Sequence, residues 1–316
     1  MNIGGIVIEP VLDGRILSKL HGTRPFPPAD SPLMADQHGM ITPDGLVEST
    51  LGAFLVRTAD RIVLVDAGAG QPISGGYVPP AIDFADPADP IAGALRARGL
   101  EAGELADAVV ADLRAGDIVQ GGLPDSLTAL GVRADEVTDV VFTHLHFDHI
   151  GWASAHGAPF FTHATFRCAA ADLRYFLDGP DEEQFVSGLY RAPTASDRLA
   201  PVLDRVETWE ADQTLLPGID VRLAPGHTPG SSVVVVSDGT DRALLLGDMV
   251  HCPLELMDDD FNLLVDHDQE LANRVREAYA RELEGSDTVA TAAHFPGLRF
   301  GRLLRGEATR RWTFAA

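Results

Sequence analysis

The stretch Thr143-His144-Leu145-His146-Phe147-Asp148-His149-Ile150-Gly151 constrains this chain more than any other feature. It places three imidazoles and one carboxylate between residues 144 and 149, directly after an apolar run. A buried polar side chain costs free energy unless it finds a partner, so four such groups this close together need a common one. A metal centre supplies that partner. Chance clustering of three surface histidines is the competing interpretation.

We expect the cluster on a loop at the end of a strand. Residues Val137 to Phe142 form a short run of β-branched and aromatic side chains, which is typical of a buried strand. His144 and His146 are two residues apart, so on extended backbone both can point to one side. Imidazole and carboxylate without thiolate favour zinc, manganese, iron or cobalt over a structural cysteine-rich zinc site.

Three isolated residues further along the chain are candidates for the same site. His227 lies in a turn rich in Gly and Pro after the alternating strand predicted over 219–223. Asp248 and His294 each follow a short apolar run that is typical of a strand. Each of the three alone would be a turn residue more often than a ligand. Together with the histidine cluster, each of the three is more readily interpreted as a ligand than as a turn residue.

Taken in order, these residues resemble the five motifs of the metallo-β-lactamase-fold hydrolases, over about residues 50 to 305. The motifs correspond to Asp66, the block from His144 to His149, His227, Asp248 and His294. The His-x-His-x-Asp-His block is highly specific, and each other motif would be weak by itself. The resemblance implies an α/β fold, an αββα sandwich in which two sheets lie between two layers of helices.

The resemblance also implies two divalent metal ions per chain, with zinc as the first choice and manganese, iron or cobalt as alternatives. Each ion would have three ligands of its own: His144, His146 and His227 for one, and Asp148, His149 and His294 for the other. Asp248 would bridge the two ions. Asp66 would orient a ligand histidine by accepting its other ring N–H, or would simply cap the end of its strand.

Such a pair of ions implies hydrolysis without a protein nucleophile. Two metals roughly 3.5 to 4 Å apart deprotonate a shared water, and the bridging hydroxide attacks a carbonyl or phosphoryl centre. Asp248 and Asp148 would be catalytic as ligands beside that water, and Asp148 is also a candidate proton shuttle to the leaving group. The sequence contains no Gly-x-Ser-x-Gly elbow that would compete for the role of nucleophile.

The residue at position 251 bears on the substrate. The segments Gly247-Asp248-Met249-Val250-His251 and Asp266-His267-Asp268 are similar to the lactonase and methyl-parathion-hydrolase-like branch. Several acyl-homoserine lactonases have Tyr where this chain has His251, and that Tyr can contact the substrate carbonyl. His251 is therefore either a candidate catalytic residue or a structural histidine. The implied reaction is hydrolysis of a small ester or lactone, in class EC 3.1.

Other activities stay open at this point. Phosphotriester hydrolysis of the methyl-parathion kind and thioester hydrolysis of the glyoxalase II kind use the same metal motifs. A mononuclear iron dioxygenase is the alternative from a different class, but relatives of that kind use one metal and do not require Asp148, His149 and His294. A non-catalytic sensor would be expected to lack some of these ligands, and the sequence retains them all.

Composition restricts the partners. The chain has 24 Lys and Arg against 47 Asp and Glu, a net charge of -23, which disfavours nucleic acid and anionic membranes and leaves a small-molecule substrate. No apolar run approaches the ~20 residues that span a bilayer, and the N-terminus lacks a signal pattern, so the expected location is cytoplasmic. Cys168 and Cys252 give no disulfide framework. A homodimer is compatible with the sequence.

The pattern predicts a single domain over 1–316, with a loop-rich arm at 21–48 and an insertion at 71–100. Both segments are rich in Pro, Gly and Asp, and loops of this length usually have a function. We expect at least one to cover the metal site or join a subunit interface, with disordered decoration as the alternative.

Apolar spacing predicts helices over 104–114, 124–130, 164–177 and 269–283. The last of these places an apolar stripe against a sheet, formed by Leu271, Val275, Ala278, Tyr279 and Leu283.

Overall fold

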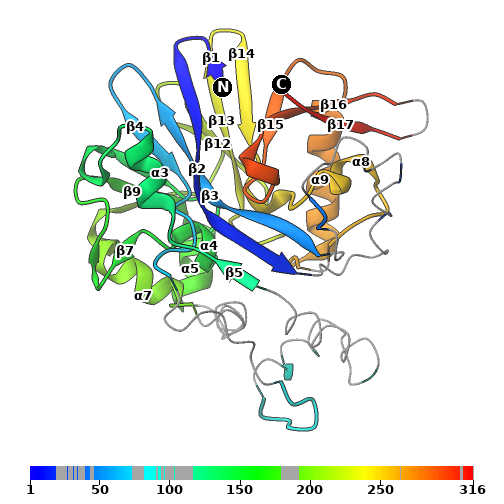
Figure 1. Cartoon of the computed structure of the whole chain (residues 1–316), viewed down its shortest axis with the longest axis horizontal. Coiled ribbons are helices and arrows are strands. Elements are labelled where there is room, and N and C mark those ends of the chain that lie inside the picture. The colour runs from blue at the N-terminus through cyan, green and yellow to red at the C-terminus, as the bar shows by residue number, and fades with distance from the viewer. Residues whose placement is uncertain are drawn as a thin grey trace.

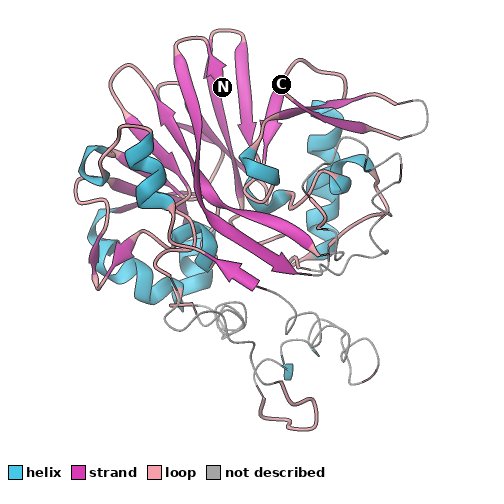
Figure 2. Cartoon of the chain, in the orientation of Figure 1, coloured by secondary structure: helices cyan, strands magenta, loops and turns pink. Residues whose placement is uncertain are grey.

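The computed structural model describes residues 1–18, 27, 31, 34, 40–42, 46–72, 82–89, 92–93, 96, 103, 117–178, 192–263, 265–306 and 309–315. Two sheets lie face to face, with helices on both outer sides (Figure 1). The two labelled ends of the chain lie toward the same end of the sandwich in this view (Figure 2). This is the αββα arrangement, so the predicted fold is confirmed.

The first sheet has eight strands within the described residues, in the order β1-β2-β3-β4-β6-β9-β10, with β5 paired to β2. The bounds are β1 Asn2–Ile3, β2 Ile6–Ser18, β3 Val47–Arg57, β4 Ile62–Val65, β5 Asp117–Val119, β6 Asp139–Val141, β9 Thr165–Ala169 and β10 Val206–Trp209. Pairs from β1 to β4 are antiparallel, whereas β4, β6, β9 and β10 run parallel. The carboxyl ends of these four strands therefore meet at one edge.

The second sheet has seven described strands, which follow their sequence order from β11 to β17. The bounds are β11 Gln213–Leu216, β12 Ile219–Leu223, β13 Ser232–Asp238, β14 Asp241–Leu245, β15 Val289–Thr291, β16 Gly301–Leu304 and β17 Arg311–Phe314. Only the pair β14 and β15 is parallel among the described neighbours. A small separate hairpin consists of β7 Ser154–Ala155 and β8 Ala158–Pro159.

The helices are short except for one. Those within the described residues are α3 Leu123–Ala129, α4 Phe147–Ile150, α5 Ala170–Asp178, α7 Ala195–Leu199, α8 Leu254–Met257 and α9 Gln269–Leu283. The same part of the chain contains the 3-10 turns η2 Ala134–Glu136, η3 Ala200–Arg205, η4 Gly247–Met249 and η5 Pro296–Leu298. Figure 1 shows α3, α5 and α7 beside the first sheet and α9 beside the second. No helix among the described residues is long and apolar enough to cross a membrane.

The layers follow from the alternation of side chains along the strands. In β4, Leu64 packs in the cluster that contains Leu127 of α3, while the next residue, Val65, packs between the sheets with Val234 of β13. Val235 turns to the opposite face and joins the cluster beneath α9. Because both faces of these strands are covered, their sequences read as continuous apolar runs rather than as alternating ones.

Two of the predicted helices are confirmed, at α3 and α9. The helix predicted over 164–177 is wrong over residues 164–169, where β9 extends from Thr165 to Ala169 before α5 begins at Ala170. Phe166 is fully buried here and β9 pairs in parallel with β6, so its place in the sheet overrides the local helical spacing. The helix predicted over 104–114 lies outside the described residues.

Most of the arm 21–48 and of the insertion 71–100 also lies outside the described residues, so neither prediction is tested. At the end of the arm, β3 begins at Val47. In α9 the buried stripe is rotated relative to the predicted one, because it contains Ala272 and Arg276 while Ala278 is exposed. Burial of an arginine on this face could not be read from apolar spacing.

Candidate metal centre

The candidate residues all lie in the segments that follow the carboxyl ends of strands, on loops or in short helical turns. Asp66 follows β4, His144 to His149 follow β6, His227 follows β12, Asp248 follows β14 and His294 follows β15. The first two loops belong to the first sheet and the other three belong to the second. The site therefore straddles one edge of the sandwich, where a rigid sheet fixes the position of each loop.

The loop that carries the histidine cluster is held against the loop after β4. Gly151 donates its N–H to Gly68 O at 2.7 Å, and Ala67 donates to His149 O at 2.6 Å. A Cβ at position 151 would lie 2.0 Å from the carbonyl carbon of Ala69, so only glycine allows this approach. His146 precedes the short helix α4, which contains Asp148 and His149.

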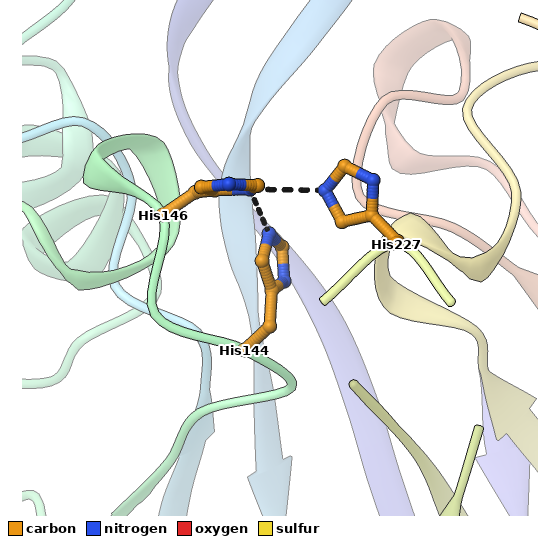
Figure 3. A group of neighbouring side chains, drawn as sticks. All are labelled: His144, His146 and His227. Carbon is orange, nitrogen blue, oxygen red and sulfur yellow. Dashed lines mark hydrogen bonds between the residues drawn. The ribbon is translucent and has the colours of Figure 1, made fainter. Parts of the chain in front are cut away.

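Three histidines from two loops converge in a first group (Figure 3). The Nδ1 atom of His146 lies 2.9 Å from His144 Nε2 and 2.9 Å from His227 Nε2. Burial lowers the pKa of both His144 and His146 well below the usual value, and neighbouring rings add to the effect. Both rings are therefore neutral, which is the state that binds metal.

Asp148, His149 and His294 form a second group beside the first. His294 Nε2 lies 3.5 Å from Asp148 Oδ2, and His149 Nε2 lies 3.9 Å from Asp148 Oδ1. The other nitrogen of each ring is already occupied: His294 Nδ1 donates to Thr50 O at 3.0 Å, and His149 Nδ1 lies 3.0 Å from Asp66 Oδ2. Both Nε2 atoms are thereby directed at the centre of the site.

Asp248 lies between the two groups. Its Oδ1 is 3.3 Å from His149 Nε2, and its Oδ2 is 3.5 Å from His227 Nε2 and 3.1 Å from His294 Nε2. Burial opposes ionisation of this carboxyl, but the His294 and His149 rings outweigh it and hold the pKa of Asp248 well below its ordinary value. The carboxylate is therefore ionised, and it contacts both groups: Oδ1 faces His149, and Oδ2 lies between His227 and His294.

Several buried atoms at the centre have no hydrogen-bond partner among the described residues. They are His149 Nε2, Asp248 Oδ1 and both ring nitrogens of His251. A buried polar atom without a partner costs roughly 1 to 3 kcal/mol, so a cluster of them needs a ligand. Imidazole nitrogens and carboxylate oxygens are the donors that divalent zinc, manganese, iron and cobalt accept. The residues present therefore fit a pair of such ions.

Asp66 lies where the predicted orienting role requires it. Besides contacting His149, its carboxylate accepts the backbone N–H of Thr143 at 2.8 Å and the Thr143 hydroxyl at 2.9 Å. Its φ is 62°, a left-handed value that aspartate tolerates better than most residues. The side chain both follows the last residue of β4 and contacts the His149 ring, so the geometry is compatible with both roles left open by the sequence.

His251 lies at the site. Its Nε2 is 3.5 Å from Asp248 Oδ2, its Nδ1 is 3.4 Å from Glu255 Oε2, and its ring is 4.8 Å from that of His227. Burial disfavours the charged ring, but the Asp248 and Glu255 carboxylates outweigh burial and raise the pKa of His251 to about 9. The ring lies beside the candidate metal ligands, where its Nε2 can contact an oxygen of a bound molecule.

Three buried carboxylates that support the site were not identified from the sequence. Asp266 Oδ1 lies 3.1 Å from His227 Nδ1, and Glu255 accepts the backbone N–H of His251 at 2.7 Å. Asp172 accepts the Thr228 hydroxyl at 2.9 Å from the start of α5, and burial raises its pKa to about 7. Asp266 lay in a segment that the resemblance had already singled out. The sequence around Glu255 and around Asp172 indicated no role for either residue.

Comparison with known proteins agrees with this geometry. The sequence profile of the Metallo-beta-lactamase superfamily matches residues 53–294, a range that includes every candidate metal ligand. No curated protein sequence matches the chain.

Three similar solved structures are all hydrolases of related type. A dizinc quorum-quenching lactonase, AidC, solved with a product, has a TM-score of 0.71 at 20% identity and covers 100% of this chain and 96% of its own. AbOPH, a hydrolase in the beta-lactamase superfamily, has a TM-score of 0.70 at 18% sequence identity, and the match covers 100% of this chain and 96% of AbOPH. An N-acyl homoserine lactone hydrolase with product at its catalytic metal centre has a TM-score of 0.53 at 18% sequence identity, and the match covers 90% of each chain. At such identities the likeness establishes the fold.

Proposed function

Because the chain belongs to the metallo-β-lactamase superfamily, we propose that it is a hydrolase that uses two divalent metal ions to cleave a small ester or lactone. The observation that carries the proposal is the position of Asp248. Its Oδ1 lies 3.3 Å from His149 and its Oδ2 3.5 Å from His227, so one carboxylate faces both groups of candidate ligands. A bridged pair of ions needs such a shared ligand.

The ligand sets are those that the two groups present, and we propose zinc as the ion in both. His144, His146 and His227 would hold one ion, Asp148, His149 and His294 the other, and Asp248 both. When bound, the ions supply an activated water and polarise the carbonyl of the substrate. Asp66 keeps the proton of His149 on Nδ1, away from the reacting groups.

Two further side chains would handle protons and substrate. Asp148 is buried beside His294 and is the candidate that carries a proton to the leaving alkoxide. His251 donates a hydrogen bond to the carbonyl oxygen of the substrate in this proposal, because its Nε2 lies 3.5 Å from Asp248 Oδ2, beside both groups of candidate ligands. No serine or cysteine nucleophile is required.

Lactones and esters are favoured as substrates by the surroundings of the first group. Phe176 packs edge-on against His146 with ring centres 5.4 Å apart, and Tyr175 lies 5.1 Å from Phe176. An aromatic wall next to a candidate metal ligand suits an acyl or aryl group. The net charge of -23 disfavours anionic substrates.

Phosphotriester hydrolysis is the second candidate, because His251 stands at a position where parathion-hydrolase-like proteins also have histidine. A mononuclear iron dioxygenase is less compatible with the geometry, since Asp148, His149 and His294 assemble a second group with nitrogens directed inward. The thioesterase alternative has no supporting contact among the described residues. The cytoplasmic location, the small-molecule partner and the homodimer stay predictions from the sequence.

Metal analysis combined with a substrate screen tests the proposal. Purified protein should hold about two divalent ions per chain, and it should hydrolyse lactones or aryl esters faster than thioesters and phosphotriesters. His144→Ala should lose metal and reduce turnover by more than about 100-fold, since loss of a ligand exceeds the effect of altering a residue behind one. His163→Ala, a change at an exposed histidine, is the matched control. A single iron per chain, or full turnover in His144→Ala, would refute the proposal.

A further inference from the structure

Helix α9 buries a charged residue on the face that it turns to the second sheet. Arg276 is 2% exposed and has Ala272 and Ala280 as buried neighbours one turn away on each side. A guanidinium is unfavourable in such surroundings unless each of its donors is matched. Its contacts therefore indicate what the helix holds in place.

The guanidinium of Arg276 is fully paired. Nη2 lies 3.0 Å from Asp266 Oδ2 and 3.4 Å from Glu255 Oε1. Nη1 donates to Asn262 Oδ1 at 2.9 Å, and Nε donates to Met249 O at 3.0 Å. Because the arginine fork is planar and rigid, it fixes the two carboxylates relative to one another.

Each of these carboxylates reaches a histidine of the site with its other oxygen. Asp266 Oδ1 lies 3.1 Å from His227 Nδ1. Glu255 Oε2 accepts the backbone N–H of His251 at 2.7 Å and lies 3.4 Å from the Nδ1 atom of the same ring. Arg276 is thus linked to both histidines, in each case through one intervening carboxylate.

We propose that Arg276 is a positioning residue that directs His227 and His251 through Asp266 and Glu255 and so sets the affinity of the three-histidine group for its ion. The inference rests on the proposed function, because it assumes that this group binds metal. Without the guanidinium, two buried carboxylates would face each other with no cation between them. Their repulsion would turn them away from the rings that they now hold.

The second group of candidate ligands has separate supports. His149 is oriented by Asp66, and His294 donates to Thr50 O. The structure shows no contact between Arg276 and either support. Loss of Arg276 should therefore weaken one of the two ions and leave the other, whereas a general loss of structure would weaken both.

The test compares two arginines on the same helix. Arg276→Met removes the guanidinium but keeps the length and apolar stem of the side chain. Arg274→Met is the control, because Arg274 is exposed and pairs with Glu270 on the surface. Zinc affinity is measured by competition with a chromophoric chelator, and the coordination is followed by the visible absorption of the cobalt-substituted protein.

We expect Arg276→Met to bind one of its two zinc ions roughly 10- to 100-fold more weakly, with an altered cobalt spectrum, while Arg274→Met matches the wild type. Arg276→Lys should fall between the two, because it keeps the charge and loses the fork. If Arg276→Met does not fold, Arg276→Lys and Asp266→Asn carry the same test.

A double variant shows whether Arg276 acts through Asp266. If it does, Asp266→Asn combined with Arg276→Lys should weaken zinc binding little more than the worse single change, whereas Asp66→Asn combined with Arg276→Lys should weaken both ions. Wild-type affinity and spectrum in the Arg276 variants, or losses that multiply in the Asp266 pair, would overturn the inference. A wild-type chain that binds no zinc would instead refute the proposed function.

Discussion

The two halves of the sandwich contribute to the candidate centre in different ways. The first half supplies His144, His146, Asp148 and His149 from one continuous loop, whereas the second supplies His227, Asp248 and His294 from three loops. In the first half, backbone hydrogen bonds hold the whole loop against its neighbour at once. In the second half, each residue needs its own support. The candidate centre thus depends on backbone hydrogen bonds between two neighbouring loops on one side and on a separate contact behind each histidine on the other.

The change with the largest expected effect is at Asp248, since its carboxylate faces both groups. Asp248→Ala should leave less than about one ion per chain and lower turnover by more than 100-fold, because no other side chain in the described site contacts both groups in this way. Elemental analysis after dialysis and a steady-state assay measure the two effects. Asp241→Asn, an exposed change on the strand that leads to Asp248, is the control. Retention of two ions would show that Asp248 is not shared.

Removal of a single candidate ligand of the second half should abolish binding of one ion and leave the other bound. His227→Ala and His294→Ala should each retain about one ion per chain, because His227 lies with His144 and His146 whereas His294 lies with Asp148 and His149. Each should also lower turnover strongly, since the reaction is proposed to need both ions. Metal content is the deciding measurement, and stability should be checked by thermal unfolding in chelator. Loss of both ions from either variant would mean that the two groups are not independent.

The role of the loop from His144 to His149 could be predicted from its own sequence. The roles of His227, Asp248 and His294 could be predicted only when the three were taken together with that loop. The spacing of His144, His146 and His149 predicts a metal site by itself, because packing alone does not account for such a density of polar side chains. His227 and His294 are ordinary strand-end residues until they are matched, in order, with that loop. The fold followed from the same match. Apolar residues also predicted the strands β6 and β12, over 137–142 and 219–223.

The supports behind the ligands could not be predicted, because they depend on contacts between distant segments. Arg276 lies on a helix whose apolar residues predicted a stripe rotated away from it, and only packing on the second sheet shows it to be buried. Its partner Glu255 lies in a short helix that no pattern marked. The helix predicted over 164–177 is wrong at β9 for a related reason. Pairing with β6 determines the conformation of this segment, and that pairing is a long-range contact. Local spacing carries no information about such partners.

The smallest expected effect concerns Asp172, which joins the two halves of the site. From α5 its carboxylate accepts the Thr228 hydroxyl at 2.9 Å and the Gly230 N–H at 2.6 Å, both in the loop that carries His227. Burial raises its pKa from 3.8 to about 7. Between these values the unfolded chain releases a proton that the folded protein retains. The contribution of this group to stability therefore falls as pH rises through that window, by at most about 1.4 kcal/mol per pH unit.

Asp172→Asn should remove that slope while keeping the contacts, because an amide oxygen still accepts from Gly230 and the amide N–H can donate to the hydroxyl of Thr228. Denaturant unfolding in chelator, from about pH 4 to 7, should show the variant gaining stability relative to the wild type as pH rises. Asp178→Asn, an exposed change on the same helix, should follow the wild type. Parallel curves for all three proteins would mean that Asp172 ionises freely in the folded state. In that case the link between the halves would be an ordinary charged contact.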